Sequence, residues 1–456
     1  MTKNLTEGNP RKVIISYTIP LFISVVFQQI YSIADSVIAG RFAGENALAA
    51  VGASYPVTMI FMAVAMGFQI GCMVVISKNF GSSNMQRTKT CISTSLVSGL
   101  VISVALTIPG LLSGNYLMKL LDTPENIFSD SVLYLKIYLG GFVFLFLYNV
   151  ATGVFNSIGD SKTPLYLLIG SSIGNIILDA VFVINFHLGV AGVAWATFIA
   201  QGAACIFSLI ILKKRLKTIT NVKSEVFSLK EFLFILRIAV PSILQQSFVS
   251  VGNLFVLKRV NFFGSSVVAG YSSAIKLNTF AITSFSTLGN GISSFTAQNL
   301  GCRRSERVRQ GFKAGLIFAL SISVMFFILF FVFAGPFVKM FMEKGNTGLA
   351  LDTGVEFLKI VTPFYFTVCT KLICDGVLRG SEKMWMFMTS TFTDLIMRVV
   401  LSYIFSSFCG ARGIWLSWPI SWLTATVLSV IFYISTVRHY STDVKDDGKE
   451  QSLKSV

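Results

Sequence analysis

The chain has 456 residues, of which 54% are hydrophobic and only 13% are charged, and its mean hydropathy is +0.72. Soluble domains carry about 25% charged residues, so this composition excludes an ordinary soluble protein. The formal net charge of +16 raises nucleic acid as a partner, but the basic residues lie between long apolar segments. We therefore predict an integral membrane protein whose partner is the lipid bilayer and not nucleic acid.

Twelve apolar stretches follow one another along the chain, each about as long as the 20 residues that a membrane-spanning helix needs. The predicted fold class is therefore all-α, with twelve transmembrane helices. In chain order the predicted spans are 13–38, 48–76, 91–112, 131–156, 164–186, 190–212, 232–257, 267–298, 312–335, 355–378, 386–408 and 413–436.

The distribution of lysine and arginine predicts the orientation, because basic residues gather on the cytoplasmic side of a membrane protein. Of the 37 basic residues, 24 fall on one side of the predicted spans and seven, Arg41 and Lys344 among them, on the other. We expect both termini to be cytoplasmic and the protein to lie in the cell membrane. The first span follows a polar stretch and lacks the pattern of a cleavable signal, and the polar segment 440–456 is predicted to be disordered.

The two halves of the chain resemble each other at an offset of 220–221 residues. Each half holds six predicted spans, so both halves insert in the same direction, as two six-helix bundles related by a pseudo-two-fold axis along the membrane normal. The matching pairs are Pro20 and Pro241, Gly44 and Gly264, Gly71 and Gly291, Asn79 and Asn299, Gly81 and Gly301, Arg87 and Arg307, Gly159 and Gly380, Lys162 and Lys383, Gly189 and Gly410, and Gly192 and Gly413.

This repeat predicts the domain organisation, in which the longest basic loop joins the two halves. The predicted parts are a cytoplasmic N-terminal tail 1–12, an N-lobe 13–212, an inter-lobe loop 213–231, a C-lobe 232–436 and a cytoplasmic C-terminal tail 437–456.

Acidic side chains inside the predicted spans are the strongest functional signal. A carboxylate in the middle of a spanning helix costs about 2.5–3.5 kcal/mol on insertion scales, so a role or a partner must offset it. Asp35 lies in the outer part of the first span, and Asn175 and Asp179 share one face of the fifth because they are four residues apart. Thr197 and Asp179 lie equally far from the turn near residue 188, so antiparallel packing would bring them to one depth.

We predict that Asp35, Asn175, Asp179 and Thr197 form a cation-coupling site. Hard cations such as sodium prefer oxygen ligands, while burial and a neighbouring like charge also favour a protonated carboxyl group. Both readings stay open, as does the alternative that the acids only join neighbouring helices. At the repeat offset Asp35 and Asp179 correspond to Val256 and Val400, so the second half lacks these acids.

Other polar residues inside the spans give weaker signals. Gln28, Gln69 and Asn149 are candidates for a substrate cavity. Asp394 and Arg398, four residues apart, are expected to form an ion pair. Asp375 is expected to have a helix-end or gating role, and Lys276 is a cation without an assigned role. The two histidines form no cluster, and the seven cysteines, expected to pack between helices, have no metal-ligand spacing. With no catalytic motif either, we predict neither an enzyme nor a protein with a bound cofactor.

Several segments, taken in order, resemble one family. They are IPLFISVVFQQIYSIADSVIAGRFAGENALAAVG, GVFNSIGDSKTPLYLLIGSSIGNIILDAVF, GVAGVAWATFIAQ, DGVLRGSEK and GIWLSWPISW. Over residues 10–438 the chain resembles the multidrug and toxic compound extrusion (MATE) transporters.

The resemblance implies alternating-access export of drugs or toxins, driven by inward flow of sodium or protons. In family members with an N-lobe cation site, residues at the positions of Asp35, Asn175, Asp179 and Thr197 contribute to it. The stretch VPSILQQSFVSVGNLFVL lacks the carboxylate that some branches carry on the seventh helix, so the chain resembles the branch that couples through the N-lobe. We expect lipophilic, cationic substrates and a functional monomer. The alternative is a flippase for a lipid-linked or other amphiphilic precursor.

Overall fold

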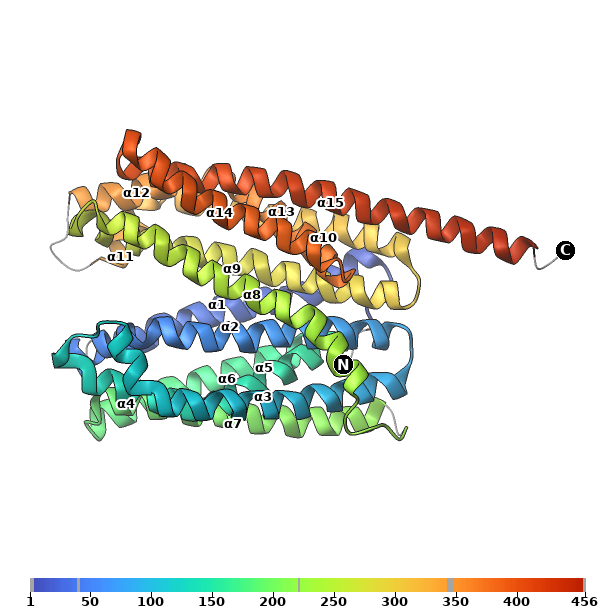
Figure 1. The fold of residues 1–456 in the computed structure, drawn as a ribbon, viewed down its shortest axis with the longest axis horizontal. Helices are drawn as coiled ribbons and strands as arrows, with labels where there is room; N and C mark the ends of the chain where they lie inside the picture. Colours follow the sequence, from blue (N-terminus) through green and yellow to red (C-terminus); the bar gives the residue numbers. More distant parts are fainter. Residues whose placement is uncertain (1–3, 39–41, 220–221, 343–347, 454–456) are drawn as a thin grey trace. The chain divides into compact units, whose positions relative to one another are not determined.

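The computed structural model describes residues 4–38, 42–219, 222–342 and 348–453, and in these ranges it contains helices and no strand (Figure 1). Arg41 and Lys344, which count toward the predicted outer side, lie outside these ranges. The elements are α1 (Pro10–Ile38), α2 (Glu45–Gly81), α3 (Met85–Leu120), α4 (Glu125–Gly140), α5 (Phe142–Ser157), α6 (Lys162–Asp179), the π-helical turn η2 (Ala180–Asn185), α7 (Gly189–Ile219), α8 (Leu229–Asn261), α9 (Ser265–Gly301), α10 (Ser305–Val332), α11 (Ala334–Met340), α12 (Leu349–Val361), the 3-10 turn η3 (Thr362–Phe364), α13 (Tyr365–Gly380), α14 (Met384–Cys409) and α15 (Ala411–Leu453).

Each of the twelve predicted spans corresponds to a helix or to a broken pair of helices. In the described residues ten segments are long and apolar enough to cross a membrane, and the pair α4 and α5, bent by 45°, would make an eleventh. The remaining predicted span, 267–298, corresponds to α9. This helix has 37 residues, which is long enough to cross a membrane. Its buried face is rich in serine and glycine, so its mean hydropathy is too low for it to count among the ten segments.

The chain divides into two compact units, one formed by residues 19–247 with 1–3 and the other by residues 4–18 with 248–456. The division falls inside α1 and inside α8, so each of these helices belongs partly to both units. The lobes predicted from the sequence begin instead at residues 13 and 232, at the starts of these two helices.

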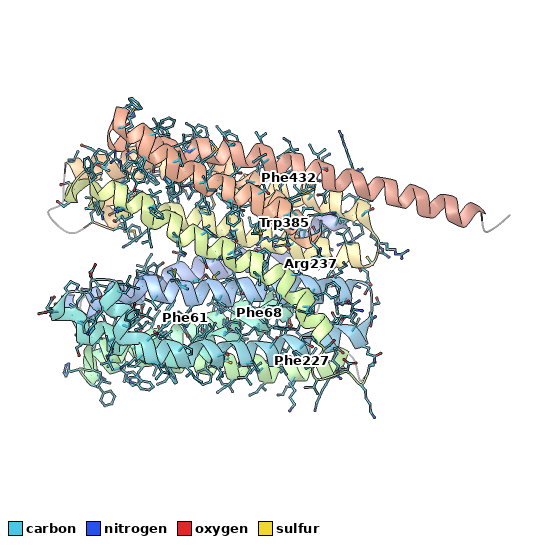
Figure 2. All side chains as sticks on the ribbon, in the orientation of Figure 1. Phe61, Phe68, Phe227, Arg237, Trp385 and Phe432 are labelled. Carbon is cyan, nitrogen blue, oxygen red and sulfur yellow. The ribbon has the colours of Figure 1, made fainter. Side chains whose placement is uncertain are left out.

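In the first unit, α2 packs against α3, α4 and α5. Aromatic rings fill the contact between α2 and α5: Phe61 meets Phe142 edge-on at 5.0 Å, and Phe68 lies 5.4 Å from Phe146 (Figure 2). Edge-to-face contacts of this kind add about 0.5–1.5 kcal/mol beyond the burial of apolar area.

In the second unit, α9 packs against α12 and α13, and α14 packs against α15. Its core holds a group of large rings in which Tyr271 stacks on Trp415 at 5.2 Å, while Phe357 meets both Trp415 and Trp418 edge-on. This unit therefore relies on aromatic packing between α9, α12 and α15.

The backbone reproduces the repeat that the sequence predicts. Gly44 and Gly264, which precede α2 and α9, both have φ 94° and ψ 167°. Gly189 and Gly410 also share a positive φ, 54° and 62°. Residues with a Cβ rarely adopt these conformations, which explains why glycine stands at matching positions of both halves.

The paired arginines of the repeat hold equivalent segments in the two units. In the first unit Arg87 on α3 donates to Glu231 in the first turn of α8 at 2.6 Å. In the second unit Arg307 on α10 donates to the backbone oxygen of Gly8, just before α1, at 2.7 Å, and to Asn299 at 2.9 Å. Each arginine therefore fixes the segment that leads into the first helix of the opposite half of the sequence.

Two expectations differ from the structure. The segment 440–456 is not disordered throughout, because α15 continues as one helix through Leu453 (Figure 1); extending an existing helix avoids the cost of nucleating a new one. Of the seven free cysteines, Cys409 is exposed at the end of α14 and not packed between helices.

Candidate functional site

Three helices of the first unit carry the residues of the predicted cation site. Asp35 lies in the last turn of α1, Asn175 and Asp179 lie at the end of α6, and Thr197 lies in the third turn of α7. Asp179 is the last α-helical residue before the π-helical turn η2. Such π-helical turns are rare and occur often at functional sites.

The structure brings these four side chains together. The amide of Asn175 donates to the hydroxyl of Thr197 at 3.5 Å, which joins α6 to α7. The carboxyl groups of Asp35 and Asp179 lie within hydrogen-bonding reach of each other, which joins α1 to α6. Asp179 and Asn175 are 0% and 2% exposed, so water does not solvate them freely.

Four oxygen atoms of this group lack donors in the described part of the chain. Asp35 Oδ1, Asn175 Oδ1 and both carboxylate oxygens of Asp179 are buried without a hydrogen-bond partner in the described residues. Ionised carboxylates only accept hydrogen bonds, so neither acid can satisfy the other. A proton shared between them, or a cation held among these oxygens, would supply the missing partner, and the all-oxygen set suits a hard cation such as sodium.

Two tyrosines also lie at the site, and neither was predicted from the sequence. Tyr31 on α1 lies close enough to Asp35 and Asp179 to interact with both charges, and its hydroxyl is within hydrogen-bonding reach of Thr197. Tyr134 on α4 also lies near both acids. Tyr31 is four residues before Asp35, so the helical spacing could have identified it. Nothing in the sequence near Tyr134 points to the site.

The three candidate cavity residues do not form a group. Gln28 on α1 is exposed, and Gln69 on α2 is half-buried, with its side chain against Gly153 of α5. Asn149 on α5 donates to the backbone oxygen of Leu145 in its own helix at 2.8 Å. The contacts that these side chains make within the described residues do not connect them with one another.

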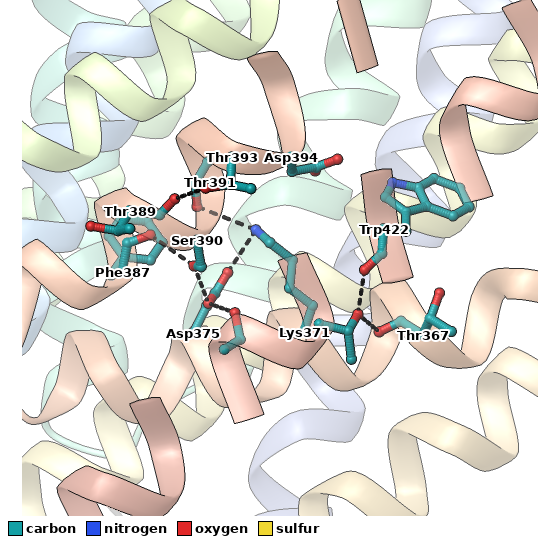
Figure 3. A network of polar contacts seen from close by, with 12 residues as sticks. Thr367, Lys371, Asp375, Phe387, Thr389, Ser390, Thr391, Thr393, Asp394 and Trp422 are labelled. Carbon is teal, nitrogen blue, oxygen red and sulfur yellow. Dashed lines mark hydrogen bonds and ion pairs between the residues drawn. The ribbon is translucent and has the colours of Figure 1, made fainter. Parts of the chain in front are cut away.

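The acids of the second unit are paired. The carboxylate of Asp375 on α13 accepts from Lys371 at 2.8 Å, from Ser429 at 2.8 Å and from Ser390 at 3.1 Å (Figure 3). Lys371 also donates to Thr391 at 3.2 Å. Asp375 therefore belongs to a closed network inside the unit, whereas we expected a helix-end or gating role for it.

The predicted ion pair of Asp394 and Arg398 is confirmed. One guanidinium nitrogen of Arg398 lies 2.8 Å from both oxygens of Asp394, and the guanidinium lies 4.2 Å from the ring centre of Trp418. Lys276 lies over the ring of Phe341 at 5.6 Å. Among the described residues, no three histidine, cysteine or acidic side chains gather as ligands for a metal ion, so the two acids of the first unit would rely on neutral oxygens to complete a site.

Two helical repeats of six spans each, with unpaired acids buried inside one repeat, define the class of membrane transporters. The MatE family model matches residues 20–181 and 241–404, one segment in each half. The chain therefore belongs to the MatE family and is a multi-pass membrane transporter, which confirms the prediction that it is not an enzyme.

Known proteins resemble the chain over most of its length. It is 27% identical to the "Probable multidrug resistance protein YoeA" of Bacillus subtilis (strain 168), covering 91% of this chain and 92% of that protein. It is 24% identical to the "FAD transporter" of Shewanella oneidensis, covering 72% and 74%. Among solved structures, the "Outward-facing conformation of a multidrug resistance MATE family transporter of the MOP superfamily" matches with a TM-score of 0.91 at 23% identity, covering 97% and 99%. The fold of twelve helices in two bundles is thereby confirmed.

Proposed function

We propose that the protein exports lipophilic, cationic drugs or toxins across the cell membrane in exchange for inward-moving sodium ions or protons. In this proposal it acts as a monomer with both termini in the cytoplasm. The observation that carries the proposal is the pair of carboxylates in which Asp35 Oδ1 and both oxygens of Asp179 are buried without a donor in the described residues. Similarity to multidrug resistance proteins supports drug export over the flippase alternative.

The site explains how ion binding can change the conformation. Asp35 is on α1 and Asp179 is on α6, so a sodium ion or proton between them removes their repulsion and draws the two helices together. Asn175 and Thr197 supply neutral oxygens, and Tyr31 supplies a hydroxyl that can donate to an ionised acid. When the ion leaves, repulsion favours the separated arrangement of the helices.

Antiport requires that ion and drug stabilise different states of the transporter. A ligand that binds two states equally shifts neither, however tightly it binds. We propose that the ion stabilises the state in which α1 and α6 approach each other, and that the drug stabilises the state in which they separate. Gln28, Gln69 and Asn149 are the residues that we propose for drug contact.

The test is efflux of a fluorescent cationic dye from proteoliposomes that contain the purified protein. A sodium gradient and a pH gradient are imposed separately, for the wild type and for Asp35→Asn. We expect one gradient to drive efflux in the wild type and neither to drive it in the variant. The gradient that works identifies the coupling ion.

Asp122→Asn is the matched control, because Asp122 is exposed in a turn with φ 49°, a conformation that asparagine tolerates. This control should transport normally. Gradient-driven efflux that survives in Asp35→Asn would overturn the site. One relative is named an FAD transporter, so FAD is included as a competitor. If FAD blocks efflux of the dye and other cationic dyes do not, the proposed substrate class is wrong.

A further inference from the structure

The first turns of α8 carry two cations on an exposed apolar face. Leu229, Lys230, Leu233, Phe234 and Arg237 line a shallow hollow of about 500 Å³ there. Residues three, four and seven positions apart share one face of a helix, so Lys230 and Arg237 lie at the two ends of this face, about 10 Å apart along the axis.

The opposite face of α8 is fixed to the first unit, which explains why the hollow stays open. Glu231 accepts from Arg87 at 2.6 Å and from the thiol of Cys91 at 3.1 Å. One turn further, Ile235 and Ala239 lie so close to Gly71 of α2 that a Cβ there would be 2.7 Å from the Ala239 side chain. These contacts bury one face of α8 and direct the cationic face outward.

Both cations lack a partner in the described part of the chain. Among the residues that the structure describes, neither Lys230 nor Arg237 forms an ion pair or a side-chain hydrogen bond. Leu229 and Leu233 beside them are 62% and 57% exposed. The face therefore offers positive charge next to apolar surface at the point where a spanning helix begins.

A second hollow lies around the residues that lead into α8. It has a volume of about 300 Å³, and its lining comes from α3, from Phe227 just before α8, which is labelled with Arg237 in Figure 2, and from Phe232 in the first turn of α8. The lining residues are Val97, Ser98, Val101, Ile102, Phe227 and Phe232. This second hollow offers further apolar surface near the start of α8.

We propose that this face of α8 binds an anionic phospholipid. Its phosphate lies between Lys230 and Arg237, and one acyl chain follows Leu233 and Phe234. A guanidinium pairs well with phosphate oxygens, and basic side chains at the end of a spanning helix attract anionic lipids. A cationic drug would be repelled here, so the face is separate from the proposed transport path.

The repeat shows that the site is particular to α8. At the offset of 221 that pairs Pro20 with Pro241, Lys230 corresponds to Asn9, just before α1, and Arg237 to Ser16 in α1. The equivalent helix of the other half therefore lacks both cations at these positions. It does carry Arg11 and Lys12, both exposed, which provide a control with equal charge.

The test measures lipid retention by native mass spectrometry of the purified full-length protein, equilibrated with phosphatidylglycerol or with phosphatidylcholine of the same chain length. We expect the wild type to retain phosphatidylglycerol in preference. In Lys230→Gln/Arg237→Gln that retention should fall about tenfold or more, because each basic residue contributes to the attraction. Arg11→Gln/Lys12→Gln should retain phosphatidylglycerol as the wild type does.

Two further measurements identify the occupant. Leu233→Ser should weaken retention of phosphatidylglycerol severalfold, and soluble glycerol 3-phosphate should not displace it, because the acyl chain contributes to binding. Equal retention of both lipids, or equal loss in the two double variants, would overturn the proposal. Displacement of phosphatidylglycerol by an acidic peptide at equal concentration would also overturn it, in favour of a protein partner. None of these readouts depends on transport, so they are independent of the proposed antiport.

Discussion

Two buried acids of the second unit differ in their partners from the two acids of the proposed cation site in the first unit. In the second unit, Asp375 and Asp394 each pair with a basic residue four positions away on the same helix. In the first unit, Asp35 and Asp179 come from different helices and face each other, with no basic partner among the described residues. The cost of burying a charge is therefore offset by a basic partner at Asp375 and Asp394, as it is at Glu231 in the first unit, and it is left open at Asp35 and Asp179.

The difference shows which acids can respond to an ion. Asp375 and Asp394 each have a basic partner on their own helix, so neither needs a cation from outside. Asp35 and Asp179 lie on different helices, so the energy of their interaction changes when those helices move. We therefore propose that these two acids link occupancy by a cation to the positions of α1 and α6.

The largest effect is expected for Asp179→Asn, which removes one of the two acids of the proposed cation site. We expect efflux of the cationic dye to fall to the background of protein-free vesicles, because the ion loses a charged ligand. The midpoint of thermal unfolding should stay unchanged or rise slightly, since asparagine keeps the shape and removes an unpaired buried charge. Dye efflux and unfolding are measured on the same preparation, and efflux equal to that of the wild type would contradict the assignment.

The opposite outcome is expected for Asp375→Asn in the second unit. Lys371, which is 3% exposed, would be left as an uncompensated buried charge, and removing one member of a buried pair costs about 3–5 kcal/mol. The midpoint of thermal unfolding should fall accordingly.

The double variant Lys371→Met/Asp375→Leu is the control for this prediction, because it removes both charges and should regain most of the lost stability. If Asp375→Asn alone is as stable as the wild type, Asp375 is not held as the structure indicates.

The smallest effect is expected for Thr197→Val, which keeps the shape of the side chain and removes one hydroxyl. A neutral hydrogen-bonding group contributes about 1 kcal/mol, so the concentration of coupling ion needed for half-maximal efflux should rise about fivefold. The maximal rate should be retained. Thr197→Ser keeps the oxygen and should behave as the wild type, and a Thr197→Val titration curve that coincides with the wild-type curve would remove Thr197 from the site.

Much of the fold follows from local sequence, because spans and repeats depend on composition and spacing. The approach of the fifth and sixth predicted spans was also predictable, since a short turn makes them antiparallel neighbours, but Thr197 accepts its hydrogen bond from Asn175, one turn before Asp179. The ion pair of Lys371 and Asp375 has the same spacing as that of Asp394 and Arg398, yet we assigned Asp375 to a helix end and overlooked its partner.

Other features depend on tertiary structure and leave no local signal. Tyr134 lies near the acids on α4, which packs against α2, α3 and α7, and spacing along the chain does not reveal this. The π-helical turn after Asp179 was likewise not predicted. The hollow on α8 could not be predicted from the sequence, because it depends on the contacts of Glu231 with α3 and of Ala239 with α2.

The division of the units inside α1 and α8 has a mechanical consequence. The chain crosses from one unit to the other only at these two places in the described residues, near residues 18–19 and 247–248. Because α1 also carries Asp35 beyond its crossing point, a movement of α1 at the proposed cation site would act on residues of both units.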